Sequence, residues 1–471
     1  MISDTLSVLA IRHSPSSERR LHVHGAVLTQ GQYLRDGTVI IQGSRVVGVE
    51  KRTPASDGAI DVETRSLLTP GFVDAHNHVA YGVFARWNPN KLMTSRFDWR
   101  GKSRCAVVNP SPSPEYGARI QRPFREIRDK LTNHCVRYGQ LRGLIGGATT
   151  IVTDAEFSPF DRPEALAGFV RDHSEWSARI WGVLDVTCLT QPSPGERPLL
   201  DRIREDIEAQ AQQGKAPPVV LVHCGEGSQP HDLLEFTMLD ELGLLNDRAV
   251  LIHGLALGPT HWARVREARA SVVWSPSSNL RLYGRTIAIE ELRAPGSRVC
   301  LAPDWAPTGT STMLDELAVV RERFAGKFSA TELFGMVTAA PADILGLEGL
   351  GRLRANGVAD ILAFRCGDEP PQTLEQAAEL VVSARPEQLE LAMINGDAVY
   401  GTEALLARCG VDVQSAERIS VASEGGAFER RLRLPGEDSA HGLAETIRAA
   451  LAACKEGPVA LAPLWEATDL R

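Results

Sequence analysis

The stretch Pro70-Gly-Phe-Val-Asp-Ala-His-Asn-His78 decides how the middle of this 471-residue chain is interpreted. It has the composition of a short apolar strand that ends in two histidines two positions apart. Residues two apart on a strand face the same side, so both imidazoles can point at one metal ion. Taken alone, the His-x-His pair fits polar surface as well as a metal site, and the rest of the chain must separate the two.

Further apolar runs follow between residues 71 and 345, with amphipathic stretches such as 162–175, 200–213 and 312–324 between them. Strands that alternate with helices predict a parallel sheet, and at this length a TIM-like (β/α)8 barrel is its natural closure. Seven strand candidates can be counted: 71–76, 149–153, 179–186, 219–224, 249–255, 271–274 and 299–302. Either the barrel is incomplete, or an eighth strand too polar to recognise lies between residues 187 and 215.

Both ends of the chain are rich in β-branched residues and in Gly-containing turns, over 21–28 and 37–49 at one end and over 351–364 and 393–400 at the other. This pattern predicts a small β-sandwich domain built from both ends, with the α/β barrel inserted between them. The expected domains are 1–70 plus 350–405 for the sandwich, 71–349 for the barrel, and 406–471 for a C-terminal extension that is partly helical, with a helix over 441–455.

Composition and charge exclude several classes of protein. Apolar residues make up 43% and charged residues 23% of the chain, and the formal net charge is −8, which gives no electrostatic grip on nucleic acid or on an anionic membrane. We find no run of about 18 apolar residues and no secretory signal. Eight cysteines without a CxxC pair indicate reduced thiols. We therefore expect a soluble cytoplasmic protein with a small-molecule substrate, no membrane partner, and homo-oligomerisation as an open option.

Polar side chains end three more of the predicted strands. Val219-Val-Leu-Val-His-Cys-Gly-Glu226 places His223 at the end of one strand and Glu226 three residues later. The next strand ends in His253, and the last is followed by Asp304. Catalytic residues of this fold come from the carboxyl ends of different strands. Buried imidazoles and carboxylates need partners, and a shared divalent metal ion supplies one.

With these motifs the chain resembles the amidohydrolase superfamily, in particular its branch of cytosine, guanine and adenosine-type deaminases and triazine chlorohydrolases. The resemblance covers almost the whole chain and adds two motifs, Val272-Val-Trp-Ser-Pro-Ser-Ser-Asn279-Leu-Arg281 and Ala302-Pro-Asp304-Trp-Ala-Pro-Thr-Gly-Thr-Ser311. It does not point to a subfamily of known substrate. It implies a barrel with a split β domain and a metal-dependent hydrolase of carbon–nitrogen bonds.

The resemblance also implies the roles of individual residues. The metal ligands would be His76, His78, His223 and Asp304, with one coordination position left for water. Asp304 would also accept a proton from that water, and His253 would stabilise the water beside the metal. Glu226 would carry protons to a ring nitrogen and to the leaving group, which is general acid–base catalysis.

The expected cofactor is one divalent ion, zinc first, with iron or manganese as alternatives. Binuclear members of the superfamily often use a carboxylated lysine on a middle strand. The only lysine between Asp154 and His223 is Lys215, in a loop-like Gly-Lys-Ala-Pro-Pro stretch, which favours one ion over two. A second His-x-His pair, His22 and His24, falls in the predicted sandwich, and we interpret it as surface.

Candidate substrate-binding residues are Trp87, Asn279, Arg281 and Trp305. Arg281 could pair with a substrate carboxylate, or equally with a neighbouring loop. The tryptophans could stack on a planar ring, together with Trp99 and Arg100, or could close the first long loop. That loop, residues 82–128, is rich in Pro and Arg and has little periodicity.

The function that these residues predict is hydrolytic deamination of a small cyclic amidine or amino-heterocycle. An amide, lactam or dipeptide hydrolase on the same scaffold is the alternative. A non-catalytic relative kept for assembly is a more remote one.

Overall fold

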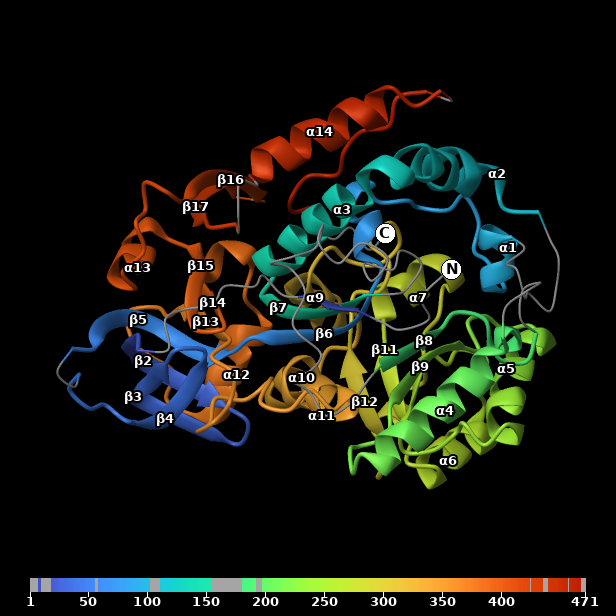
Figure 1. Cartoon of the computed structure of the whole chain (residues 1–471), viewed down its shortest axis with the longest axis horizontal. Helices are drawn as coiled ribbons and strands as arrows, with labels where there is room; N and C mark the ends of the chain where they lie inside the picture. The colour runs from blue at the N-terminus through green and yellow to red at the C-terminus, as the bar shows by residue number, and fades with distance from the viewer. Residues whose placement is uncertain are drawn as a thin grey trace.

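The computed structural model describes residues 7–9, 18–55, 58–101, 111–153, 180–191, 197–423, 425–434, 439–455 and 457–466. Within these ranges the strands form one nine-stranded sheet and two smaller sheets built mainly of parallel strands (Figure 1). The helices pack around the parallel strands, apart from a few that belong to the nine-stranded sheet or to the C-terminal segment. The arrangement is an α/β fold of the TIM-barrel kind with a separate β-rich domain.

The nine-stranded sheet combines both ends of the described chain, in the order β16-β17-β15-β14-β13-β5-β2-β3-β4. Neighbouring strands are antiparallel except for β2 and β5, which pair in parallel. Blue N-terminal strands lie beside orange C-terminal ones in Figure 1, which confirms the β-rich domain expected from both ends. Its strands are β2 (Arg20–Thr29), β3 (Gln32–Gln42), β4 (Arg45–Lys51), β5 (Ile60–Pro70), β13 (Ile361–Arg365), β14 (Leu389–Ile394), β15 (Asp397–Gly401), β16 (Glu417–Ser423) and β17 (Gly426–Leu432).

The parallel strands match the seven that the sequence predicts. One sheet has the order β12-β11-β10-β9-β8, and in the other β6 pairs in parallel with β7, while β1 (Ser7–Leu9) is antiparallel to β7. Their bounds are β6 (Phe72–Asn77), β7 (Ala148–Thr153), β8 (Ile180–Val183), β9 (Val219–Cys224), β10 (Ala249–His253), β11 (Ser271–Trp274) and β12 (Arg298–Leu301).

Hydrogen bonds join the two parallel sheets at one side. The Asp304 N–H donates to the His76 carbonyl at 3.3 Å, and the His78 N–H donates to the Asp304 carbonyl at 3.1 Å. The polar eighth strand expected between 187 and 215 is absent from the described parts of that range, which hold the 3-10 helix Val186–Leu189 and helix α4 instead.

Three of the predicted helices are present, as α4 (Leu199–Gln212), α9 (Met313–Arg323) and α14 (Ala440–Ala452), whereas the one expected over 162–175 lies outside the described residues. The C-terminal segment is therefore partly helical, as expected, but it also supplies β16 and β17.

The other helices are α1 (Arg96–Arg100), α2 (Pro114–Tyr116), α3 (Arg122–Ile145), α5 (Pro230–Glu241), α6 (Pro259–Glu267), α7 (Pro276–Tyr283), α8 (Ile289–Leu292), α10 (Ala330–Val337), α11 (Ala339–Leu345), α12 (Leu374–Val382) and α13 (Glu403–Arg408). Short 3-10 helices span Val79–Val83 and Pro386–Gln388, and a π-helical turn spans Gly117–Gln121.

The long first loop is more regular than its sequence indicates. Helix α1 begins at a capping box, in which the Ser95 hydroxyl accepts from the backbone of the first turn and the Asp98 carboxylate accepts from the Ser95 N–H. Trp99 and Arg100 lie on this short helix, so the cap fixes where both side chains enter the interior.

Side-chain alternation along β9 sets the direction of its histidine. Val219 and Leu221 belong to one apolar cluster, and Val220, Val222 and Cys224 belong to another on the opposite face. His223 therefore shares a face of the strand with Val219 and Leu221. Cys224 points to the opposite face, where its thiol is buried in the core.

The thiols require one correction. Free thiols are found at Cys135, Cys224, Cys300, Cys366, Cys409 and Cys454, but Cys188 is disulfide-bonded, so the expectation of reduced cysteines throughout is wrong at that position. Among the described residues, no helix is both long enough and apolar enough to cross a membrane.

Candidate active site

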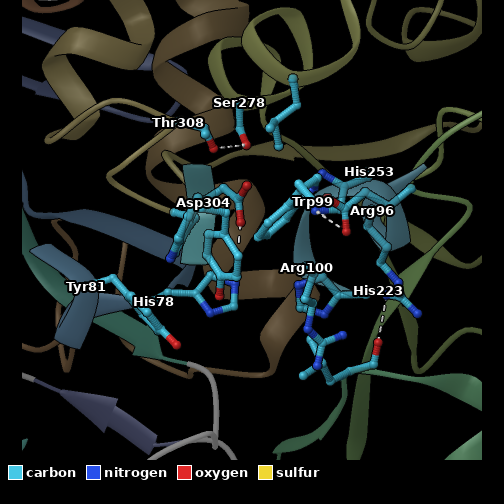
Figure 2. Close-up of a pocket in the computed structure, with 15 residues that line it drawn as sticks. His78, Tyr81, Arg96, Trp99, Arg100, His223, His253, Ser278, Asp304 and Thr308 are labelled. Carbon is cyan, nitrogen blue, oxygen red and sulfur yellow. Dashed lines mark hydrogen bonds and ion pairs between the residues drawn. The ribbon is translucent and has the colours of Figure 1, made fainter. Parts of the chain in front are cut away.

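His76, His78, His223 and Asp304 converge from three strand ends, those of β6, β9 and β12. The Nε2 atoms of His76 and His78 lie 3.0 and 3.5 Å from Asp304 Oδ1. One donor atom of each of the four residues lies within 4.8 Å of the others. Figure 2 shows His78, His223 and Asp304 facing the same pocket.

The electrostatics of this cluster suit a cation. Burial raises the pKa of Asp304, but the neighbouring imidazoles, His253 first and then His76, outweigh burial and hold that pKa below its ordinary value. Burial is also the main reason why the pKa of His223 lies well below its ordinary value. A carboxylate and neutral imidazoles are the forms that bind a divalent metal ion, so the donor set fits one.

Two residues of the site have a strained backbone. His253 and Asp304 adopt φ angles of 75° and 68°, in the left-handed region that side chains other than glycine rarely enter. Each such residue costs on the order of 1–3 kcal/mol and persists only where the surroundings enforce it, most often at functional sites. Here the strain turns both side chains from their strand ends into the pocket.

Beside the histidine–aspartate cluster, Glu226 and His253 form a second pair. Glu226 Oε2 lies 3.6 Å from His253 Nε2. The other ring nitrogen, Nδ1, is 2.9 Å from Asn279 Oδ1, and the Asn279 amide nitrogen donates to the Thr286 hydroxyl at 3.2 Å. The second carboxylate oxygen, Glu226 Oε1, accepts from the Tyr283 hydroxyl at 2.6 Å.

Both groups face one pocket with an aromatic wall. Trp99 and Trp305 are stacked with ring centroids 5.1 Å apart, and Tyr81 meets Trp305 edge to face at 5.6 Å. Rings in these arrangements offer faces on which a planar heterocycle can stack. The lining residues are His78, Tyr81, Arg96, Trp99, Arg100, Tyr116, Leu184, His223, Glu226, His253, Ser278, Leu282, Asp304, Trp305 and Thr308.

The two arginines of the pocket are held by carboxylates. Arg96 is buried and donates to Asp185 at 2.8 Å, to Glu235, and to the Leu184 carbonyl at 2.7 Å. Arg100 lies 3.3 Å from the same Asp185. Glu235 Oε2 in turn accepts from the Gly225 N–H at 2.9 Å, so this network fixes the turn that follows His223 and precedes Glu226.

Of the four predicted substrate-binding residues, one lines the pocket and three lie outside its lining. Trp305 lines the pocket, whereas Trp87, Asn279 and Arg281 are not among its lining residues. Trp87 packs behind the wall against Trp99 and Trp305, because the loop folds back on itself. Arg281 donates to the Thr308 carbonyl at 2.8 Å and to Asn88, so it braces a loop instead of facing the pocket.

Sequence reasoning missed Tyr81, Arg96 and Tyr283. Tyr81 follows the His-x-His pair by three residues, and Tyr283 follows Arg281 by two, so each lay next to a motif already singled out. Arg96 is three residues from Trp99 on α1, but no local pattern distinguishes a buried arginine from an exposed one.

The second His-x-His pair is not on the surface. His22 and His24 are 3% and 1% exposed, which corrects the sequence interpretation. His24 contacts the Thr38 hydroxyl at 2.9 Å and Asp61 at 2.5 Å, which are partners that a neutral or a charged imidazole can use.

Comparison with known proteins agrees with this geometry. Residues 221–399 match the Amidohydrolase family. A 5-methylthioadenosine/S-adenosylhomocysteine deaminase of Halobacterium salinarum is 25% identical over 84% of this chain and 96% of its own length. A 5'-deoxyadenosine deaminase of Methanoregula boonei is 32% identical over 34% of this chain and 38% of its own length.

Solved structures share the fold at lower identity. A zinc-complexed atrazine chlorohydrolase from Arthrobacter aurescens has a TM-score of 0.60 at 17% identity, over 83% of this chain and 99% of that one. Escherichia coli guanine deaminase has a TM-score of 0.57 at 17% identity, over 81% and 99%.

The family match and the relatives named as deaminases support a hydrolase. Residues 221–399 match the Amidohydrolase family, and the resemblance stated from the sequence motifs is confirmed. The chain is thus an enzyme that hydrolyses carbon–nitrogen bonds, and the non-catalytic alternative is not supported.

Proposed function

We propose that this chain catalyses hydrolytic deamination of a small amino-heterocycle. The observation that carries the proposal is Glu226, paired with His253 and facing the same pocket as the four convergent donors. Relatives named as deaminases of adenosine derivatives support it, as does an 8-oxoguanine deaminase of Pseudomonas aeruginosa that is 32% identical over 133 residues.

The proposed cofactor is one divalent ion, zinc first, held by His76, His78, His223 and Asp304. Such an ion supplies a nucleophile at neutral pH because it lowers the pKa of water bound to it. The zinc of the chlorohydrolase neighbour supports the choice of metal.

The hydrogen bond to Asn279 determines which ring nitrogen of His253 donates and which one is left to face the pocket. Asn279 Oδ1 can only accept, so His253 Nδ1 is the ring nitrogen that donates a hydrogen to it. In a neutral ring this leaves Nε2 as an acceptor that faces Glu226 and the pocket, where it can hold the proton of the attacking water.

Glu226 is the group that moves protons. Its carboxylate would take one proton from the attacking water and pass it to a ring nitrogen of the substrate. It would then take the second proton, from the hydroxyl group that the water leaves on the carbon, and give it to the departing amine, so that a carbonyl forms and ammonia is released. Trp99 and Trp305 would stack on the heterocycle and exclude bulk water.

Several broader assignments belong to the same proposal. We infer domains of 1–70 plus 350–405, 71–349 and 406–471. The first would be a β-sandwich, whose sheet β16 and β17 of the C-terminal extension join, and the second a TIM-like (β/α)8 barrel, complete or one strand short. We also infer a cytoplasmic protein with a small-molecule substrate and no nucleic-acid or membrane partner, for which homo-oligomerisation stays an open option.

The test is an ammonia-release screen of adenine, guanine and cytosine derivatives with the purified protein, alongside metal analysis. We expect about one ion per chain and turnover of at least one heterocycle. The variant E226Q should keep its metal but lose about 10²–10⁴-fold in kcat, because it cannot transfer protons. D304N should lose both metal and turnover.

Two results would contradict the proposal. Hydrolysis of lactams or dipeptides without ammonia release from any heterocycle would favour the amide hydrolase alternative. An E226Q variant with the kcat of the original protein would remove the assigned proton carrier.

A further inference from the structure

A chain of hydrogen bonds connects the first long loop to the proposed proton carrier. Trp99 Nε1 lies 3.2 Å from the Tyr283 hydroxyl oxygen, and that oxygen lies 2.6 Å from Glu226 Oε1. All three side chains are buried, with Trp99 8% exposed, Tyr283 7% and Glu226 5%. Trp99 comes from α1, Tyr283 ends α7, and Glu226 follows β9, so three separate elements meet here.

The chemistry of the groups fixes the direction of both hydrogen bonds. An indole N–H can only donate, so the Tyr283 oxygen accepts from Trp99. The single hydroxyl hydrogen of Tyr283 is then available for Glu226 Oε1, which must accept it. Burial, followed by the nearby Glu226 carboxylate, holds the pKa of Tyr283 well above its ordinary value, so the phenol keeps this hydrogen at neutral pH.

This arrangement makes the two oxygens of Glu226 unequal. Oε1 is occupied as an acceptor, and the proton that Glu226 carries must reside on Oε2. Oε2 is the oxygen that lies 3.6 Å from His253 Nε2, so the proton is held on the side of the carboxylate nearest the proposed water site.

We propose that Tyr283 is a positioning residue for the deamination assigned above, and that Trp99 acts through it, so that the position of α1 helps to set the orientation of Glu226. This inference rests on the proposed function. Trp99 stacks on Trp305 in the pocket wall, so a substrate that orders this wall would also order the indole N–H.

The experiment is a kinetic double-mutant cycle with Y283F, W99F and the double variant. Y283F should lower kcat about 10–100-fold with a change in KM of about threefold or less, as expected when an orienting hydrogen bond is lost. W99F also alters the pocket wall, so its KM effect should be the same in both backgrounds. The effect of W99F on kcat should shrink to about twofold or less in the Y283F background. Without the Tyr283 hydroxyl, no hydrogen bond connects the indole N–H to Glu226.

The matched control is Y400F. Tyr400 is also buried, its hydroxyl has no hydrogen-bond partner among the described residues, and it lies on β15 of the nine-stranded sheet. Y400F should keep the kcat of the original protein. A Y283F variant with unchanged kcat, or W99F and Y283F effects on kcat that simply multiply, would overturn the proposal.

A second measurement is independent of substrate. The indole N–H signal of Trp99 in NMR spectra, assigned by its loss in W99F, should shift in Y283F and stay in place in Y400F. An unmoved signal in Y283F overturns the hydrogen-bond chain whether or not a substrate is known. A shifted signal in a protein that deaminates none of the heterocycles would support the chain and count against the proposed function alone.

Discussion

Asn279 illustrates how one residue acts through another. The sequence motif suggested contact with substrate, but its amide instead fixes the tautomer of His253, with Oδ1 2.9 Å from Nδ1. Without this acceptor the imidazole can place its hydrogen on either nitrogen and can rotate, so Nε2 is no longer reserved for the pocket.

We therefore expect N279A to lower kcat about 10–100-fold while metal content stays unchanged. Steady-state kinetics and metal analysis of the purified variant check this. The control is N246A, because the bonds of the Asn246 side chain within the described structure stay in its own turn, at the Gly243 carbonyl and the Arg248 N–H. Equal kcat in N279A and N246A would refute the role.

Glu316 predicts how stability depends on pH. Burial raises its pKa to about 7, although hydrogen bonds from Ser277 and Thr310 oppose this. Its ordinary pKa is 4.5, so between about pH 4.5 and 7 the folded chain binds more protons than the unfolded chain. The stabilisation from this group is fully present below about pH 4.5 and is lost as the pH rises through about 7.

The variant E316Q mimics the protonated carboxyl at every pH. Relative to the original protein, we expect its free energy of unfolding to increase from pH 5 to about pH 7 and to level off above that. Urea unfolding of both proteins with saturating metal measures this difference. A difference that is constant with pH would show that Glu316 has the same pKa in both states.

At the scale of elements, the contact between α3 and the 3-10 helix Val79–Val83 supports the site. This short helix follows His78 directly and carries Tyr81 into the pocket. A Cβ atom at Gly139 on α3 would lie 1.9 Å from the Val79 carbonyl oxygen, so the two backbones can approach this closely only at glycine.

The substitution G139A should destabilise the chain by about 1–3 kcal/mol and lower kcat/KM, because it pushes Val79 and Tyr81 away from their positions. Thermal unfolding and kinetics test it. G335A in α10 is the matched control, since outside its own helix no described residue lies within 4 Å of the added methyl group, and it should stabilise by about 0.4–1 kcal/mol. Stabilisation of the same size at both positions would show that helix propensity dominates and that the contact with Val79 costs nothing.

At the scale of the whole molecule, the C-terminal segment braces the first loop from outside. The Ala462 N–H donates to the Val83 carbonyl at 2.9 Å, and the Tyr138 hydroxyl donates to the Ala462 carbonyl at 2.6 Å. Trp465 is 4% exposed and donates to Asp315 at 3.0 Å. Residues almost 400 positions apart thereby stabilise the same wall of the pocket.

We expect W465A to cost about 3–5 kcal/mol of stability and to raise KM. W465F keeps most of the packing but removes the N–H, and should cost about 1–3 kcal/mol by leaving Asp315 short of a donor. Urea unfolding and steady-state kinetics of the pair would separate packing from hydrogen bonding. An unchanged KM in W465A would show that the contacts of the C-terminal segment do not affect substrate binding in the pocket.

Local signals in the sequence were sufficient for the elements and for the candidate metal ligands. Strand periodicity placed the seven parallel strands, and the two β-rich ends predicted their shared sheet. His76, His78, His223 and Asp304 were recognisable because each ends a strand, and parallel strands bring their carboxyl ends to one edge. Strand direction and side-chain alternation are local properties, so the residues themselves determine them.

Tertiary structure alone decided which other side chains reach the pocket. Trp87 and Trp305 are the same type of residue and both follow sequence motifs. Trp305 nevertheless lines the pocket, whereas Trp87 packs behind the pocket wall. The link from Trp99 through Tyr283 to Glu226 joins three elements whose approach depends on the packing of the whole chain. Burial and hydrogen-bond partners depend on residues distant in sequence, so they arise only when the chain has folded.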